Sequence, residues 1–406
     1  MGVHDDRNGG DLAVLPPRFG PVGVTRLALT DFRNYRSARL DLTPGPVVLT
    51  GPNGAGKTNL LEAVSVLSPG RGLRNARLGD LDRRGDGDDA EGCWAVAATI
   101  ETRHGPVKIG TGRDPAGASL QPAGSTRGER RVVRIDGEPA RSQAALGEVI
   151  GVIWLTPQMD RLFIEGPSAR RRFLDRLVLG LDPAHAARAS SYEQAMRERS
   201  RLLRDGPNDP TWLSAIEETM AAQGVAVAAA RRDAVERLDE VCAAAEGPFP
   251  RARLSLNGMV EIWLDELPAL AAEDRFRAAL KDSRAADTAS GGAAVGPHRS
   301  DLAVTHAERG LPAETMSTGE QKALLISIVL AHARLQRETR GASPLLLLDE
   351  VAAHLDAARR DALFSTLLSL ESQVWLTGTD SALFAQLRAA ARFLSVSDGA
   401  LSETAI

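Results

Sequence analysis

The fold class of this 406-residue chain is indicated by one short stretch, Gly51-Pro52-Asn53-Gly54-Ala55-Gly56-Lys57-Thr58. It fits the pattern G-x-x-x-x-G-K-[ST], whose glycines let backbone N–H groups turn inward around a polyphosphate. The lysine then reaches the β- and γ-phosphates, and the threonine hydroxyl binds Mg²⁺. A buried strand is expected at Val47–Thr50 and a helix over residues 58–67, which is the context that this motif requires. The competing interpretation is a glycine-rich turn with an incidental lysine.

A second stretch, Leu345-Leu346-Leu347-Leu348-Asp349-Glu350, supplies acidic side chains. Four leucines predict a buried parallel strand, and α/β folds bind ligands at the carboxyl ends of such strands. Asp349 is then expected to hold the Mg²⁺ shell, and Glu350 to be the general base that orients an attacking water. Taken alone, a helix end would explain the run about as well; the phosphate loop upstream favours the strand.

A third stretch, Ser317-Thr318-Gly319-Glu320-Gln321-Lys322, opens a long apolar helix expected over residues 319–336. A Ser-x-Gly turn at a helix N-terminus can present its hydroxyl, its N–H groups and the helix dipole to an anion. A plain N-cap, with Glu320 three residues into the helix, is physically sufficient as an alternative.

The rest of the chain divides into segments that differ in composition and in the spacing of their apolar residues. Residues 1–21 are predicted to be a disordered tail, and strands expected at 24–29, 38–42, 94–100, 132–135 and 152–155 suggest an antiparallel layer, interrupted by loops at 83–92 and 114–128. Residues 168–205 and 211–246 predict two antiparallel helical limbs joined by a turn at 206–210, with a break in the first limb near Gly180 and Asp182-Pro183. Residues 283–297 suggest a linker or mobile loop, before a helix at 357–368 and a strand at 374–377.

Composition excludes several classes of protein. Cys93 and Cys242 are the only cysteines, so a disulfide framework or a cysteine-based zinc site is excluded and a reducing cytoplasm is expected. The longest apolar stretch, residues 323–333, is too short to span a bilayer, and no membrane role is expected. The 49 basic and 53 acidic residues give a net charge of −4, so only local charge can indicate binding to DNA.

Several further motifs, in order, resemble those of the ABC-type ATPase heads of SMC-like repair proteins, and within that group the RecF family. They cover most of the chain from about residue 24 onward. The resembling segments, besides the three stretches above, are residues 29–35, 56–63, 68–71, 157–160, 166–167, 171–175, 296–301 and 349–356. The resemblance implies an ATPase lobe made of residues 22–160 and 296–406, and a helical lobe with a short antiparallel arm at 161–295.

The resemblance also implies how the motifs work together. ATP would be sandwiched between two copies of the chain, with Ser317 and Gly319 of one copy closing on the γ-phosphate held by Lys57 of the other. Residues 51–58 together with Asn59 would bind this ATP, and Asp356 would lie in a loop crossing the dimer interface. The Ser-x-Gly turn would then not need to approach the phosphate loop within one chain.

The chain departs from the family pattern at three places. Its signature is Ser-Thr-Gly-Glu-Gln, where transporter ATPases usually have Ser-Gly-Gly-Gln. Thr377-Gly378-Thr379-Asp380 occupies the place of a switch histidine, so Thr379 is predicted as the γ-phosphate sensor. Gln158 stands where the family usually has an acidic residue and is a candidate for the lobe-connecting glutamine near Mg²⁺. A catalytic role is one alternative for His298 and Arg299, but a His-Arg pair after Gly-Pro is more often a loop anchor, and a structural role linked to the nucleotide is predicted for them.

Local charge points to the helical lobe as the DNA-binding part. Residues 168–205 contain nine arginines against five acidic residues. Their cluster, predicted to track DNA phosphates, consists of Arg170, Arg171, Arg172 and Arg176. The alternative is a solvated helical surface whose arginines pair with Asp175 and Glu198. Aromatic residues make up only 4%, so backbone contact with duplex DNA is favoured over extensive base stacking.

The leading functional hypothesis is therefore an ATP-dependent DNA-binding clamp. It would bind ATP and Mg²⁺ and dimerise on gapped DNA or duplex/single-strand junctions. Slow, DNA-dependent ATP hydrolysis would then release the DNA. The resemblance implies roles in repair, replication and the SOS response, single-stranded DNA binding, and RecR and RecO as partners in loading recombinase. A transporter ATPase subunit is an alternative, although the roughly 260 residues between the phosphate loop and the signature of this chain are far more than such subunits usually carry. A chromosome-structuring ATPase is another, although limbs of roughly 40 residues are short for its coiled coil.

Overall fold

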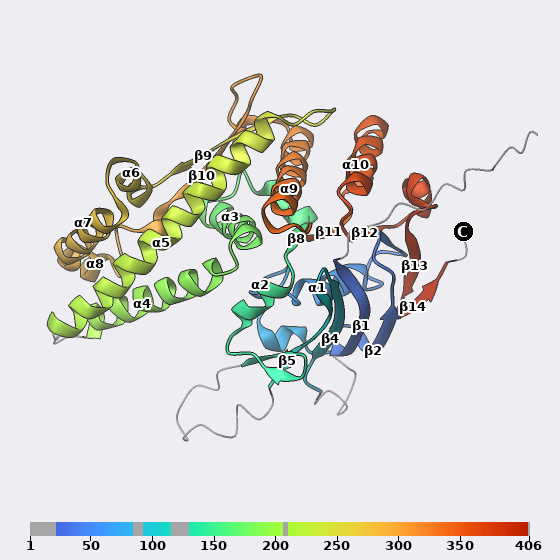
Figure 1. The fold of residues 1–406 in the computed structure, drawn as a ribbon, viewed down its shortest axis with the longest axis horizontal. Helices are drawn as coiled ribbons and strands as arrows, with labels where there is room; N and C mark the ends of the chain where they lie inside the picture. The colour runs from blue at the N-terminus through green and yellow to red at the C-terminus, as the bar shows by residue number, and fades with distance from the viewer. Residues whose placement is uncertain (1–21, 84–91, 115–129, 206–209, 405–406) are drawn as a thin grey trace, which may run out of the picture.

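The structure is a computed structural model that describes residues 22–83, 92–114, 130–205 and 210–404. The predicted tail, nearly all of the two predicted loops and most of the predicted turn at 206–210 lie outside the described residues. Two six-stranded sheets form one end of the molecule, and a helical arm extends from it to the left in Figure 1.

The mixed sheet carries the phosphate loop. Its strand order is β14-β13-β3-β12-β11-β8, with only β14 antiparallel to its neighbour. The strands are β3 (Val47–Thr50), β8 (Val152–Leu155), β11 (Leu345–Leu348), β12 (Val374–Gly378), β13 (Arg392–Ser397) and β14 (Ala400–Glu403). Leu345 and Leu347 belong to one hydrophobic core and Leu346 and Leu348 to the other. The leucine run is therefore a strand buried on both faces, and the prediction of a strand is confirmed.

The antiparallel sheet has the order β2-β1-β4-β5-β6-β7. Its strands are β1 (Gly23–Phe32), β2 (Tyr35–Asp41), β4 (Ala95–Thr102), β5 (Gly105–Arg113), β6 (Arg131–Ile135) and β7 (Glu138–Pro139). Helix α1 (Lys57–Ser65) lies between this sheet and the mixed sheet, and its apolar residues share their core. The sequence did not predict β5, because three glycines and a proline weaken its strand propensity.

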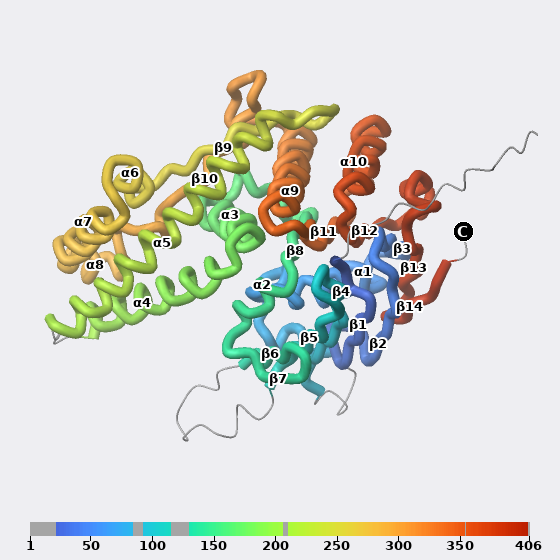
Figure 2. The backbone as a smooth tube through the Cα atoms, in the orientation of Figure 1, coloured from blue at the N-terminus to red at the C-terminus, as the bar shows by residue number. Residues whose placement is uncertain are grey.

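Helices of the arm and of the outer layer cover the other face of the mixed sheet (Figure 2). They are α3 (Pro167–Leu181), the end of α5 (Pro210–Ala243), α9 (Thr318–Arg340) and α10 (Ala357–Ser369), whereas α4 (His185–Asp205) lies farther out on the arm and α2 (Leu146–Val149) is on the other side of the sheet. The predicted break separates α3 from α4 at Asp182 to Ala184, and α5 returns alongside α4. No helix in the described parts of the chain is long and apolar enough to cross a membrane.

The far end of the arm is built on α5. Helices α6 (Met259–Glu266) and α7 (Ala269–Asp282) close a small core with Tyr192 and Met220, and α8 (Arg284–Ser290) packs beside α4. Strand β9 (Ala252–Asn257) pairs antiparallel with β10 (Asp301–His306). The domain boundary expected at residue 296 therefore lies in the segment that connects β9 to β10, two strands that pair with each other.

The predicted linker at 283–297 is wrong, because this segment contains α8 and a buried polar anchor. The guanidinium of Arg199, only 1% exposed, donates to the Asp287 carboxylate at 2.6 Å and to the Leu280 carbonyl at 2.6 Å. Alanine and serine had suggested flexibility. They are compatible with a helix once a buried charge on α4 requires partners from this segment.

Candidate nucleotide site

The phosphate loop leaves the carboxyl edge of the mixed sheet directly after β3. Gly51 has a φ of 145°, and a Cβ there would lie 2.2 Å from the carbonyl oxygen of Val396. Gly56 has a φ of 115°, and a Cβ there would lie 2.5 Å from the amide of Asn34. Neighbouring backbone and side chains therefore require glycine at both positions.

The turn between β1 and β2 supports this loop. Asn34 donates its amide to the Ala55 carbonyl at 3.1 Å, and the Tyr35 hydroxyl donates to the Gly56 carbonyl at 3.0 Å. The amide of Asn59 donates to the Asn34 side-chain oxygen at 2.7 Å. Asn59, which was predicted to bind nucleotide, thus supports the loop through Asn34. Asn34 and Tyr35, both from the 29–35 motif, support the loop directly.

Lys57 is the first residue of α1 and is 5% exposed. Its ammonium donates to the carbonyls of Gly51 and Pro52 at 2.7 and 2.9 Å, which holds the charge at the loop. Burial lowers its pKa, while the nearby carboxylates of Glu350 and Asp349 act in the opposite direction.

Thr58 and Asp349 meet as the sequence predicts. The Thr58 hydroxyl lies 3.0 and 3.1 Å from the two carboxylate oxygens of Asp349, and the Thr377 hydroxyl donates to the same carboxylate at 2.7 Å. Burial raises the pKa of Asp349, and the hydrogen bonds from Thr377 and Thr58 oppose that rise. A hydroxyl beside a buried carboxylate fits Mg²⁺, which takes one or two carboxylates and completes its shell with phosphates and waters.

Glu350 follows Asp349 with an unusual backbone. Its φ is 53°, a conformation that costs a non-glycine residue on the order of 1–3 kcal/mol. The strain is held by a hydrogen bond from its N–H to the Thr377 hydroxyl at 2.8 Å. No role for Thr377 was predicted from the sequence, although the parallel register of Leu348 with Leu376 places the next residue of β12 beside Asp349.

Two weaker candidates lie at the same edge. Thr379 is exposed immediately after β12, and Gln158 is exposed in a short 3-10 helix, Pro157–Arg161, that follows β8. Because parallel strands end at one edge, both are placed near Asp349, and their predicted roles stay predictions.

The signature turn is exposed at the N-terminus of α9. Ser317 and Glu320 form a capping box, in which each side chain accepts from the other residue's backbone N–H. Nothing lies within 4 Å of a Cβ at Gly319. The Arg309 guanidinium and the Ser317 hydroxyl lower the pKa of Glu320 to about 2. The plain N-cap is thus present, and the turn is also open to another molecule.

Asp356, like the signature turn, is exposed. It caps α10 by accepting from the Arg359 N–H at 2.8 Å, and its side chain is exposed. Its predicted place at a dimer interface stays a prediction.

Comparison with known proteins identifies the family. The sequence model for the RecF/RecN/SMC N terminal domain matches residues 23–402. The DNA replication and repair protein RecF of Mesorhizobium japonicum is 51% identical over 94% of this chain and 98% of that relative. This chain belongs to the RecF family. The RecF of Rhizobium meliloti is 49% identical over 94% of this chain and 99% of its own.

Solved structures agree on the RecF-family fold. The recombination mediator protein RecF-ATPrS of the RecFOR pathway aligns over 96% of this chain and all of its own, with a TM-score of 0.80 and 20% identity. An Smc head domain from Pyrococcus furiosus, with an extended coiled coil, aligns over 95% and 96% with a TM-score of 0.51 and 17% identity. The predicted ABC-type ATPase head is therefore confirmed.

The arginine cluster of this RecF-family chain does not form one free face. Arg170 binds the Asp301 carboxylate through two hydrogen bonds of 2.7 Å, and Arg171 donates to the Ser300 carbonyl at 2.7 Å. Arg172 is exposed, and its one hydrogen bond among the described residues goes to the Ser168 hydroxyl at 2.8 Å. Arg176 covers the ring of Trp154, with Cζ 3.1 Å from the ring centroid. Two of the four therefore fix α3 to β10, which local sequence could not reveal.

The His298-Arg299 motif anchors its own loop, and its predicted link to the nucleotide stays a prediction. His298 Nδ1 lies 2.7 Å from the Tyr192 hydroxyl, and its Nε2 lies 2.9 Å from the Ala293 carbonyl oxygen. Arg299 donates to the same carbonyl. Both side chains anchor this loop of the RecF-family chain to the arm.

Proposed function

We propose that this chain is an ATP-dependent DNA-binding protein of recombinational repair and replication maintenance. One observation carries the proposal: the phosphate loop, Thr58, Asp349 and Glu350 converge within one chain, whereas the Ser317–Gly319 turn is exposed and open. Such a division suits a site completed by a second copy. Relatives at about 50% identity are RecF replication and repair proteins, and a solved RecF of the same fold was studied as RecF-ATP.

The residues at the sheet edge have separate tasks. The loop N–H groups and Lys57 bind the β- and γ-phosphates, helped by the N-terminal dipole of α1. Thr58 and Asp349 hold Mg²⁺, which neutralises phosphate charge when bound. Glu350 orients the attacking water and accepts its proton, and Thr379 senses the γ-phosphate.

The second copy supplies the remaining anion contacts. The Ser317 hydroxyl and the N–H groups at the start of α9 approach the γ-phosphate held by Lys57 of the first copy, and Asp356 lies at the same interface. ATP thus favours a dimer that holds gapped DNA or a duplex/single-strand junction, and slow hydrolysis releases it. RecR and RecO are the proposed partners in loading recombinase. The protein is proposed to act in the cytoplasm and to take part in the SOS response.

A mixing experiment tests the composite site. Lys57→Ala removes the phosphate contact, and Ser317→Arg blocks the exposed turn, so each variant alone is expected to be inactive. Mixed in equal amounts, they form heterodimers in which one site keeps both Lys57 and Ser317. We expect ATP hydrolysis with gapped DNA to recover to a substantial fraction of the wild-type rate on mixing. The matched control, Ser290→Arg on exposed α8, should behave as wild type.

Two results would contradict the proposal. Mixing that restores no hydrolysis would place both motifs in one chain's site. Sedimentation that shows the same monomer with and without ATP, in the presence of gapped DNA, would exclude the ATP-driven dimer.

A further inference from the structure

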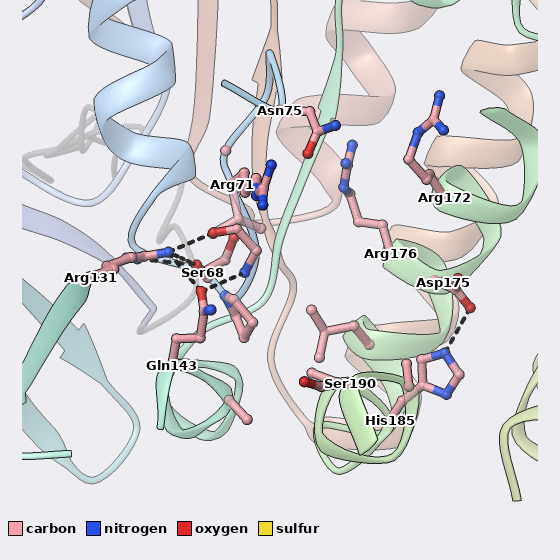
Figure 3. A pocket seen from close by; sticks show the side chains of 18 of the residues that line it. Ser68, Arg71, Asn75, Arg131, Gln143, Arg172, Asp175, Arg176, His185 and Ser190 are labelled. Atoms are coloured by element: carbon pink, nitrogen blue, oxygen red, sulfur yellow. Dashed lines mark hydrogen bonds and ion pairs between the residues drawn. The ribbon is translucent and has the colours of Figure 1, made fainter. Parts of the chain in front are cut away.

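A cleft of about 1080 Å³ separates the antiparallel-sheet side of the molecule from the arm. One wall consists of residues 68–75, 130–133 and 139–144, and the other of α3 and the start of α4 (Figure 3). Trp154 of β8 also lines the cleft. Among the described residues, seven arginines but only three acidic side chains line it. Gln158, the candidate residue near Mg²⁺, also lines this cleft, but the phosphate loop, Asp349 and Glu350 do not.

Much of this positive charge lacks an acidic partner in the cleft. Within the parts of the chain that the structure describes, the side chains of Arg71 and Arg141 make no hydrogen bond or ion pair, and both are exposed. The Asp175 carboxylate, one of the three acids, is already bound by Arg231 and His185. The cleft is therefore more basic than its composition indicates.

The arginines of the two walls face a common space. Figure 3 shows Arg71 on one wall and Arg172 and Arg176 on α3, with Arg71 and Arg176 extending into the gap. Burial, followed by the charge of Arg172, lowers the pKa of Arg176 to about 9. Guanidiniums that face one another repel unless an anion lies between them, so an anion would relieve this repulsion.

The wall that carries Arg71 is held in place. Arg131 is largely buried and donates to the carbonyls of Val66 and Gly70, which brackets residues 68–70. Arg74, in the same segment, donates to the Asn59 side-chain oxygen at 2.6 Å and to Glu62 at 2.9 Å. Both acceptors lie on α1, the helix that begins at Lys57, so the cleft wall is joined to the phosphate loop.

Size and chemistry select the occupant. A volume of about 1080 Å³ is close to the upper limit of about 1,000 Å³ for pockets that enclose a drug-sized molecule, so the cleft has room for a few nucleotides rather than for a length of duplex. The face of Trp154 is already covered by Arg176. The cleft therefore suits the phosphates of a few unpaired nucleotides better than a duplex or a row of stacked bases.

We propose that this cleft binds a short segment of single-stranded DNA through its phosphates, with Arg71 and Arg172 contacting the strand from opposite walls and Arg176 lying beneath it. The inference rests on the proposed DNA-binding function and specifies where the unpaired strand of a gap or junction lies. The sequence had assigned Arg172 and Arg176 to DNA, but it gave no indication that residues 68–75 form the facing wall.

The test compares charge reversal inside and outside the cleft in the full chain. We expect Arg71→Glu/Arg172→Glu to weaken binding of a labelled eight-nucleotide oligo(dT) at least tenfold, measured by fluorescence anisotropy with ATP present. Losing two phosphate contacts should also reduce the slope of log affinity against log salt by about 1.4. Binding of a 20-base-pair duplex should change less than twofold. The matched control, Arg201→Glu/Arg277→Glu, reverses two exposed arm arginines that do not line the cleft.

The possible outcomes are distinct. Unchanged oligo(dT) binding by the cleft variant, an equal loss in the control, or an equal loss of duplex binding would each overturn the cleft proposal. If the wild-type chain binds gapped DNA and the cleft variant binds it with the same salt slope, only the cleft proposal fails. If the wild-type chain binds no DNA in any form, the proposed function fails as well. Unchanged ATP affinity of the cleft variant confirms that it is folded.

Discussion

The carboxyl edge of the mixed sheet and the base of the arm are both rich in charged side chains, but they use them differently. At the sheet edge, Thr58 and Asp349 come from segments almost 300 residues apart and meet within hydrogen-bond distance. At the base of the arm, neighbouring Arg170, Arg171 and Arg172 have different surroundings. A motif that specifies a backbone shape thus fixes where its side chains go, whereas a run of like charges on a helix does not.

The largest effect should come from Glu350 at the sheet edge. Glu350→Gln keeps the size of the side chain but removes the base, so we expect hydrolysis to fall on the order of 10²- to 10⁴-fold while ATP binding is kept. Phosphate release and equilibrium nucleotide binding measure the two effects. Glu371→Gln is the matched control, because Glu371 also has a positive φ, of 50°, and lies outside the site. Normal hydrolysis by Glu350→Gln would remove the assignment of the base.

Lys57 tests whether the loop depends on one charge. Lys57→Ala removes a buried ammonium that no other side chain of the loop replaces, and charge-assisted hydrogen bonds contribute about 1.5–3 kcal/mol each. We therefore expect ATP affinity to fall at least 100-fold in calorimetric titration. Lys108→Ala, on an exposed position of β5, should leave it unchanged. A loss below fivefold would show that the backbone N–H groups suffice.

His332 tests how α9 joins the two regions. Its Nε2 lies 2.7 Å from the Leu177 carbonyl oxygen on α3, and burial lowers its pKa to about 4, against about 6.5 in an unfolded chain. The neutral ring therefore contributes stability fully above pH 6.5, and that stability is lost as pH falls toward 4, by about 3 kcal/mol in total.

Urea unfolding of wild type and His332→Gln at pH 7.5 and 4.5 measures this contribution. The stability advantage of wild type should shrink by about 2–3 kcal/mol at the lower pH, because other titrating groups are common to both chains. An advantage that is the same at both pH values would show that His332 does not titrate between the folded and unfolded states.

The smallest effects should separate two adjacent arginines. Arg170→Ala leaves the Asp301 carboxylate unpaired in a partly buried place, and we expect a loss of about 2 kcal/mol in urea unfolding. Arg172→Ala should change stability by less than about 0.5 kcal/mol, because its side chain is exposed. Similar losses for both would mean that α3 behaves as a uniform charged surface.

Much of the fold was predictable because its signals are local. The phosphate loop, the doubly buried leucine strand and the capped α9 each follow from a short run of residues. The errors have a common physical cause. β5 is held by pairing with β4 and β6, and residues 283–297 are ordered by Arg199, so their structures depend on partners that are distant in sequence.

The phosphate loop, the acidic strand end and the resemblance to the RecF family were readable from the residues alone, because backbone geometry leaves few residue choices at such positions. Three-dimensional packing was needed to reveal that Thr377 holds both Asp349 and Glu350, that Asn34 and Tyr35 support the loop, and that Arg71 faces α3 across a cleft. These are side-chain contacts between separate elements. Their distances depend on how the sheets and helices pack, which no short stretch of sequence specifies.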